Sequence, residues 1–223
     1  MPAGSGGNST IEGAARMTGT ATRYLYLARH GEAESEDGPL TANGRRQAVL
    51  LGRRLRDRPL SLLHHGPLPR AAQTAALIAE QLDGVAPQVS DAAGDYVPHL
   101  PERAELPADS ADFLLRFLDG VTPEEGEAGR LLAGRALDLF TGPVAGDEDR
   151  HQLVVTHSFL VGWLVRHALG APAWRWLGLH PANAALTVIR YPPGRPPAVL
   201  LHNDTRHLPD ELRWTGFPPE LRL

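Results

Sequence analysis

Two apolar runs in this chain each end on a histidine. Residues 24–28 (Tyr-Leu-Tyr-Leu-Ala) lead into Arg29 and His30, and residues 152–156 (Gln-Leu-Val-Val-Thr) lead into His157. Short apolar runs of this kind predict buried strands. In open α/β sheets, functional side chains gather beyond the carboxyl ends of such strands. We therefore expect a sheet that carries His30 and His157 at one edge.

Strand-like and helix-like segments alternate along most of the chain. Strands are predicted at about residues 23–28, 60–64, 88–89, 152–156, 184–191 and 198–202, and helices at about 41–55, 68–82, 110–118, 123–140 and 159–169. The last two strands flank the turn Pro192-Pro193-Gly194 and are expected to pair as a hairpin. Such alternation predicts helices on both faces of a sheet. The predicted fold is α/β, a three-layer α/β/α sandwich with a mostly parallel central sheet.

The length of 223 residues suits one domain with its own core. We expect residues 1–22, rich in Gly, Ser, Thr and Ala, to be a disordered leader. Residues 23–208 are expected to form the domain, and residues 209–223 a C-terminal tail. Because the sequence has no apolar stretch of membrane-spanning length, we expect a soluble, cytoplasmic protein with no membrane partner. The lack of cysteine excludes disulfides and thiolate catalysis.

Charge composition narrows the classes of partner. All 22 basic residues are arginine and the formal net charge is -4. The arginines form no basic stripe interleaved with aromatic residues, which is the pattern that nucleic-acid binding usually needs. Nucleic acid is therefore not an expected partner, and an arginine is informative here only inside a motif.

Arg29 and His30 form such a motif. Imidazole is a good nucleophile near neutral pH. A planar guanidinium can hold two phosphoryl oxygens at once. The pair at a strand end therefore indicates a phosphate site.

Three further motifs extend this one: Leu40-Thr41-Ala42-Asn43-Gly44-Arg45-Arg46-Gln47-Ala48, Pro67-Leu68-Pro69-Arg70-Ala71-Ala72-Gln73-Thr74-Ala75, and Val154-Val155-Thr156-His157. Together with Arg29-His30-Gly31-Glu32 they resemble the histidine phosphatase superfamily, also called the phosphoglycerate mutase-like family. The similarity spans residues 23–204. Four motifs in the right order are far more specific than any one of them.

This resemblance implies a covalent mechanism without metal or other cofactor. His30 would attack phosphorus and become phosphohistidine, while Arg29, Arg70 and His157 surround the phosphoryl oxygens. With a pKa near ~6.5, a free imidazole can be an unprotonated nucleophile at neutral pH, and His157, if protonated, would donate a hydrogen bond. The expected activity is hydrolysis of a phosphomonoester, either a phosphorylated small molecule or a phosphoprotein.

The leaving oxygen needs a proton from a carboxylic acid. Relatives commonly carry a glutamate for this purpose, whereas this chain reads Gly94-Asp95-Tyr96. Asp95 is our first candidate for the acid. Glu102, Glu105 and Glu32 are the alternatives.

Other polar residues near these motifs are candidates for supporting roles. Glu32 and Ser158 are close enough in sequence to the two histidines to tune them by hydrogen bonding. His65 is a further candidate pocket residue. A zinc site built from His64, His65 and His157 lacks the regular spacing and the carboxylate ligand that zinc would need.

Two other functions stay open at this point. One is phosphoglycerate mutase-type phosphoryl transfer, and the other is a catalytically weak phosphate-binding or interaction protein. Residues 85–122 are expected to form a specificity lid. This segment holds only two basic residues, Arg103 and Arg116, which argues against a very highly phosphorylated substrate. A homodimer is one candidate for the oligomeric state.

Overall fold

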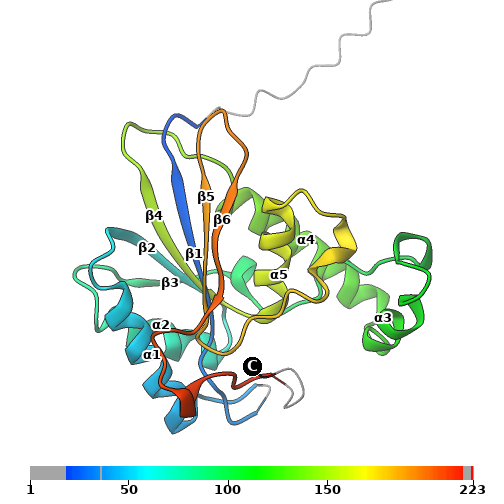
Figure 1. The fold of residues 1–223 in the computed structure, drawn as a ribbon, viewed down its shortest axis with the longest axis horizontal. Helices are drawn as coiled ribbons and strands as arrows, with labels where there is room; N and C mark the ends of the chain where they lie inside the picture. The colour runs from blue at the N-terminus through cyan, green and yellow to red at the C-terminus, as the bar shows by residue number, and fades with distance from the viewer. Residues whose placement is uncertain (1–18, 36, 218–221, 223) are drawn as a thin grey trace, which may run out of the picture.

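A six-stranded mixed sheet forms the centre of the computed structural model, which describes residues 19–35, 37–217 and 222 (Figure 1). The strands lie in the order β3-β2-β4-β1-β5-β6. Their bounds are β1 Arg23–Arg29, β2 Leu60–His65, β3 Pro87–Val89, β4 Arg150–Thr156, β5 Leu186–Tyr191 and β6 Ala198–Asp204. The first four strands in this order are parallel; β5 pairs antiparallel with β1, and β6 pairs antiparallel with β5. The predicted mostly parallel sheet with a late hairpin is confirmed.

Helices cover both faces of the sheet (Figure 1). One layer contains α1 (Ala42–Leu55) and α2 (Pro69–Ala79), and the other contains α4 (Pro123–Phe140) and α5 (Ser158–Ala168). The short α3 (Ala111–Phe117) projects beyond α4. This arrangement confirms the predicted three-layer sandwich.

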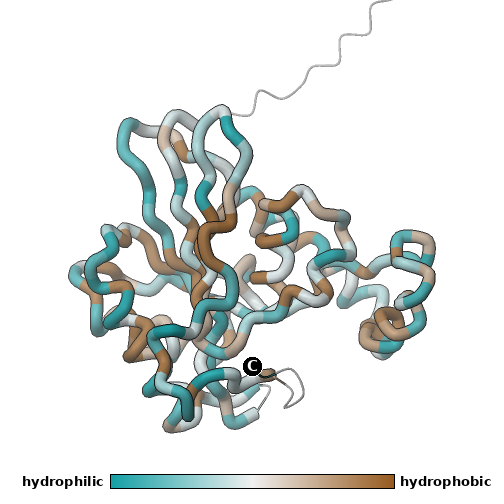
Figure 2. The backbone as a smooth tube through the Cα atoms, in the orientation of Figure 1, coloured by the Kyte–Doolittle hydropathy of each residue, from teal (hydrophilic) through white to brown (hydrophobic). Residues whose placement is uncertain are grey.

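The alternation of side chains along β1 explains the two layers. Leu25 and Leu27 are fully buried in the core that includes α4 and α5, whereas Tyr26 and Ala28 face the core that includes α1 and α2. Successive side chains of a strand point to opposite faces of the sheet, so a central strand with cores on both sides is apolar throughout. In Figure 2 hydrophobic segments accordingly lie where strands and helices pack, and hydrophilic ones lie on outer hairpin tips.

Helices α1 and α4 each begin with a threonine whose side chain caps the first turn. The Thr41 hydroxyl accepts a hydrogen bond from the Gly44 N–H at the start of α1. Thr122 and Glu125 form a reciprocal capping box at the start of α4. Helix α2 ends at Ala79, three residues before the predicted end, because the N–H groups of Gln81 and Leu82 bond three residues back, to the carbonyls of Ile78 and Ala79.

The packed structure extends beyond the predicted domain at its N-terminal end. Residues 1–18 of the expected leader lie outside the described residues. Ala21 forms a backbone bridge with Val144, and the Thr22 N–H donates to the Asp149 carboxylate at 2.9 Å. The folded part therefore includes residues that the sequence analysis assigned to the leader.

Residues 209–217, the described start of the expected tail, pack against α1. Leu212 is fully buried. The Gln47 side chain donates to the Leu212 carbonyl at 2.9 Å and to the Thr215 hydroxyl at 2.7 Å, and it accepts from the Glu32 N–H at 2.8 Å. One buried glutamine thus joins the loop after β1 to the C-terminal segment.

The helices in the described ranges include none that is both long enough and apolar enough to cross a membrane.

Replacing Gln47 with alanine should destabilise the protein by about 2–4 kcal/mol, because three polar groups would lose their partner in a buried site. Urea unfolding of the variant against the wild type would measure the change. Gln88→Ala, at an exposed position in β3, is the matched control. A loss below about 0.5 kcal/mol, the range of ordinary surface substitutions, would contradict this role of Gln47.

Candidate active site

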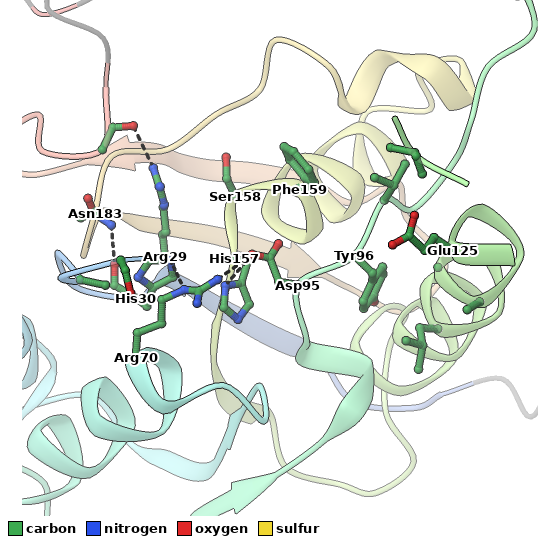
Figure 3. Close-up of a pocket in the computed structure, with 18 of the residues that line it drawn as sticks. Arg29, His30, Arg70, Asp95, Tyr96, Glu125, His157, Ser158, Phe159 and Asn183 are labelled. Carbon is green, nitrogen blue, oxygen red and sulfur yellow. Dashed lines mark hydrogen bonds and ion pairs between the residues drawn. The ribbon is translucent and has the colours of Figure 1, made fainter. Parts of the chain in front are cut away.

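The pairing of β1 with β4 brings the two predicted histidines together. Arg29 lies opposite Thr156 in the register, and the His30 N–H donates to the Thr156 carbonyl at 2.9 Å. The rings of His30 and His157 have centroids 5.0 Å apart. Both side chains line a pocket of about 850 Å³ beyond the carboxyl ends of the strands (Figure 3). The predicted position of the site is therefore observed.

Hydrogen bonds define the proton position on His30. Its Nδ1 lies 2.7 Å from the Gly31 carbonyl, which can only accept a hydrogen bond. The Arg70 Nε–H donates to His30 Nε2 at 3.2 Å, and a guanidinium can only donate. His30 is therefore protonated at Nδ1, and its unprotonated Nε2 carries the electron pair that accepts this hydrogen bond.

Two arginines, one buried and one half-buried, line the pocket with His30. Arg70 is 3% exposed. The Arg29 side chain is fixed by hydrogen bonds from its Nη1 to the carbonyls of Pro181 at 2.9 Å and Gly216 at 3.2 Å. Gly216 has a φ of 77° and leaves no room for a Cβ between the side chains of Asn183 and Arg29. The C-terminal segment therefore supports the site directly, which the sequence analysis missed.

Several buried nitrogens in the pocket have no acceptor among the described residues. They are Arg29 Nε, Arg70 Nη1 and His157 Nε2. Buried donors are normally satisfied, and a tetrahedral oxyanion offers several acceptor oxygens to donors that converge on one point. The arrangement is suited to hold a phosphoryl group in front of His30.

Asp95 lies against the same donors. Its Oδ2 is 2.8 Å from Arg70 Nη2 and 3.3 Å from His157 Nδ1, and its side chain is one third exposed. Partial burial raises the pKa of Asp95 even though the charge of Arg70 opposes this shift. The first candidate for the acid is thus in the pocket, with a carboxyl group that gains protons more readily than an exposed aspartate.

Burial also controls the charge of the histidines. It lowers the pKa of His30 well below its usual value, with further lowering by His157 and Arg29. Burial, then Arg70 and Arg29, lowers the pKa of His157 to about 3. The idea of a protonated His157 is therefore not supported for the free site. A neutral imidazole still offers one N–H to a phosphoryl oxygen.

Glu32 and Ser158 line the pocket, but their hydrogen bonds differ from the expectation. The Glu32 carboxylate accepts from the Thr41 hydroxyl at 2.7 Å. The Ser158 hydroxyl pairs with His180 at 3.2 Å. Among the described residues, these side chains therefore bond to Thr41 and His180 rather than to the two histidines that they were expected to tune.

His65, Glu102 and Glu105 are not among the residues that line the pocket. His65 Nδ1 bonds to the Gly66 carbonyl at 2.8 Å at the end of β2. Glu102 and Glu105 form their own capping box, and Glu105 also bonds to His99 at 2.8 Å. The placement of these side chains favours Asp95 over both glutamates as the acid and removes His65 from the pocket.

No cluster of three or more His, Asp or Glu side chains suited to a metal ion occurs in the described part of the chain. His64 instead packs against Phe140, with ring centroids 5.8 Å apart. The alternative of a zinc site from His64, His65 and His157 therefore has no geometric support.

Positioning groups around His30 were not identified from the sequence. The Thr74 hydroxyl accepts from the Gly31 N–H at 3.0 Å and donates to the Arg70 carbonyl at 2.7 Å. The Asn183 amide donates to the His30 carbonyl at 3.1 Å. These buried groups fix the nucleophile and Arg70 relative to each other.

Both ends of the expected lid, residues 85–122, line the pocket. Asp95, Tyr96 and Val97 come from its first part, and Gly120 and Val121 from its end. The following helix α4 contributes Glu125, which was not among the pocket residues predicted from the sequence.

Comparison with known proteins agrees with this geometry. The model of the histidine phosphatase superfamily (branch 1) matches residues 25–205. The serine/threonine-protein phosphatase Pgam5, mitochondrial, of Caenorhabditis elegans is 30% identical over 195 residues, which cover 85% of this chain and 66% of the relative. The chain thus spans about two thirds of that protein. The probable phosphoglycerate mutase GpmB of Salmonella paratyphi A is 27% identical over 194 residues, which cover 75% of this chain and 84% of that relative.

Solved structures share the fold. The mycobacterial glucosyl-3-phosphoglycerate phosphatase superimposes with a TM-score of 0.61 at 22% identity, covering 82% of this chain and 100% of that chain. The phosphoglycerate mutase of Plasmodium falciparum superimposes with a TM-score of 0.57 at 20% identity, covering 85% of this chain and 96% of that chain. At these identities the likeness establishes the fold alone.

The lowered pKa values predict that His30 and His157 stay neutral in the free protein from about pH 8 to about pH 5, a window in which an ordinary histidine takes up a proton. Ring chemical shifts in an NMR titration would report this, with the urea-unfolded chain as the reference. Because the unfolded state binds these protons and the folded state does not, the free energy of unfolding should fall as the pH drops below about 6.5. A midpoint near 6.5 for either folded ring would contradict the account.

Proposed function

The chain belongs to the histidine phosphatase superfamily, and we propose that it hydrolyses a phosphomonoester through a phosphohistidine intermediate on His30, without a metal. The observation that carries this proposal is the state of His30: its unprotonated Nε2 shares a pocket with buried nitrogens that have no acceptor among the described residues. This combination supplies a nucleophile and the donors for the oxygens around the phosphorus atom.

In the first step, the electron pair on His30 Nε2 forms a bond to phosphorus while the bond from phosphorus to the alcohol oxygen breaks. Arg29, Arg70 and the N–H of His157 hold the equatorial oxygens. Charge that develops on those oxygens is stabilised by donors that are already in place, so little reorganisation is needed during the reaction.

Asp95 is proposed to be the acid and base. Phosphoryl oxygens would compete with its carboxylate for Arg70 and His157. Once released from these donors, Asp95 would take up a proton from the phosphomonoester monoanion or from solvent and pass it to the leaving alcohol oxygen. In the second step, water attacks phosphorus, Asp95 takes a proton from that water, and the electron pair of the P–N bond returns to His30. A positioned acid–base group of this kind typically contributes about 10²–10⁴ in rate.

A mutase is the second candidate, because relatives include proteins named as probable phosphoglycerate mutases. A mutase would return the phosphoryl group to a second oxygen of the substrate instead of to water. Product analysis with 3-phosphoglycerate and a bisphosphoglycerate primer separates the two. Isomerisation faster than phosphate release would favour the mutase.

The proposed substrates are phosphorylated small molecules or phosphoproteins. A catalytically weak phosphate-binding protein, a homodimer and a cytoplasmic location stay predictions. The predicted cytoplasmic location differs from that of the relatives named Pgam5, which are described as mitochondrial.

Replacing His30 with alanine should lower p-nitrophenyl phosphate hydrolysis by at least about 10³-fold, a loss of the size seen when a nucleophile is removed. The assay is run in chelator across about pH 5 to 8. His65→Ala, outside the pocket, is the matched control and should retain turnover. Full activity in the His30 variant, or loss of wild-type activity in chelator, would contradict the proposal.

Replacing Asp95 with asparagine should affect substrates according to their leaving group. For an alkyl phosphate, kcat/KM should fall by about 10²–10⁴-fold, because the alkoxide needs the proton. For p-nitrophenyl phosphate, kcat/KM should fall much less, since nitrophenolate leaves without a proton. Equal losses for the two esters, or none for either, would exclude Asp95 as the acid.

A further inference from the structure

The pocket extends well beyond the phosphate site. Tyr96, Phe159 and Glu125 lie on the side of the pocket away from Arg29 and Asn183 (Figure 3). We call this region the alcohol subsite, since it would face the leaving group of a bound phosphomonoester. It is lined by Tyr96, Val97, Val121, Glu125, Ala128, Leu132 and Phe159. Most of its wall is therefore apolar.

The subsite is held in place by contacts outside the phosphate site. The Tyr96 hydroxyl donates to the Ala92 carbonyl at 2.8 Å, so its ring borders the pocket. Phe159 packs edge-on against the fully buried Trp176, with ring centroids 4.9 Å apart. The aromatic wall is therefore fixed by the core.

Charge in the pocket is distributed unevenly. Its lining contains two cationic side chains, Arg29 and Arg70, and the phosphoryl group would occupy both. The lid arginines do not add to them, since neither Arg103 nor Arg116 lines the pocket, and Arg103 pairs with Asp112 at 2.6 Å. A second anionic group on the substrate would therefore find no positive side chain among the described lining residues.

Acidic side chains make that second anion still less favourable. Apart from Asp95, the carboxylates in the lining are Glu32 and Glu125. The Glu32 carboxylate accepts a hydrogen bond from Thr41 and the Glu125 carboxylate accepts from Thr122, so neither is neutralised by an arginine among the described residues. The carboxylate of Glu125 points from α4 toward the site (Figure 3).

We propose that the alcohol subsite takes the leaving group of a monophosphate ester that has no second anionic group, and that Glu125 selects for an amine on that group. This inference rests on the proposed phosphatase function and names its substrate class: phosphomonoesters of apolar or amino alcohols. Esters with a carboxylate or a second phosphate are disfavoured. The preference is modest, because Glu125 is exposed and its field is screened by solvent.

Three esters of equal chain length test the charge preference: 3-aminopropyl phosphate, propyl phosphate and 3-phosphonooxypropanoate. On the wild type, kcat/KM for the amine should exceed that for the carboxylate by about threefold to tenfold, the range expected for a solvent-exposed ion pair together with loss of repulsion. Glu125→Gln should reduce this ratio to about twofold or less while keeping the capping box, which accepts Gln as well as Glu. Glu124→Gln, on the same turn but outside the pocket lining, is the control and should keep the wild-type ratio.

Binding to the His30→Ala variant separates this inference from the proposed function. Calorimetry with the same three esters measures the charge preference without turnover, so the preference can hold even if hydrolysis does not occur. Equal or tighter binding of the carboxylate ester would overturn the inference, and so would an unchanged ratio in Glu125→Gln. Hydrolysis of all three esters at equal rates would leave the phosphatase proposal intact and remove the subsite proposal.

Discussion

The parallel pairing of β1 with β4 is the interaction on which the site depends. It places Arg29 beside Thr156, so that His30 and His157 follow on adjacent strands with ring centroids 5.0 Å apart. Both strands have cores on both faces, which fixes their register, because a slip by one residue would turn every side chain to the opposite face. The geometry of the two histidines is therefore set by the sheet rather than by a loop.

Charge in the site follows from placing the buried Arg70 and the half-buried Arg29 next to two buried imidazoles. Buried cations are costly unless they are paired, and Arg70 pairs with Asp95 in the free protein. The guanidinium groups and the burial together keep the histidines neutral, which leaves the electron pair of His30 Nε2 available. A phosphoryl group would replace the Asp95 carboxylate on the donors, so a single acidic residue can serve first as counter-ion and then, after it takes up a proton, as acid. The neutral state of His30 and the proposed role of Asp95 as the acid therefore both depend on the two arginines.

The sequence predicted what depends on local pattern and missed what depends on distant packing. His30, Arg29, Arg70 and His157 sit at strand and helix ends, which apolar runs and turn residues locate well. Gln47 and Gly216 act through contacts between the first third of the chain and its end, which no local pattern reveals. Glu125 belongs to the capping box of α4 and also lines the pocket, and its position in the chain does not reveal this second contact. His65 was predicted to be a pocket residue, but its ring bonds to the neighbouring Gly66 carbonyl and does not line the pocket. The sequence does not distinguish these two placements of a histidine at a strand end.

Direct capture of the phosphorylated enzyme tests the central claim most directly. The wild type is mixed with p-nitrophenyl phosphate, quenched in alkali, in which phosphohistidine survives, and digested for peptide mass spectrometry. The account predicts one added phosphoryl group on the peptide that contains His30, and none after His30→Ala. Turnover without any phosphorylated peptide, or a phosphoryl group on His157 or on a serine in the wild type, would contradict it.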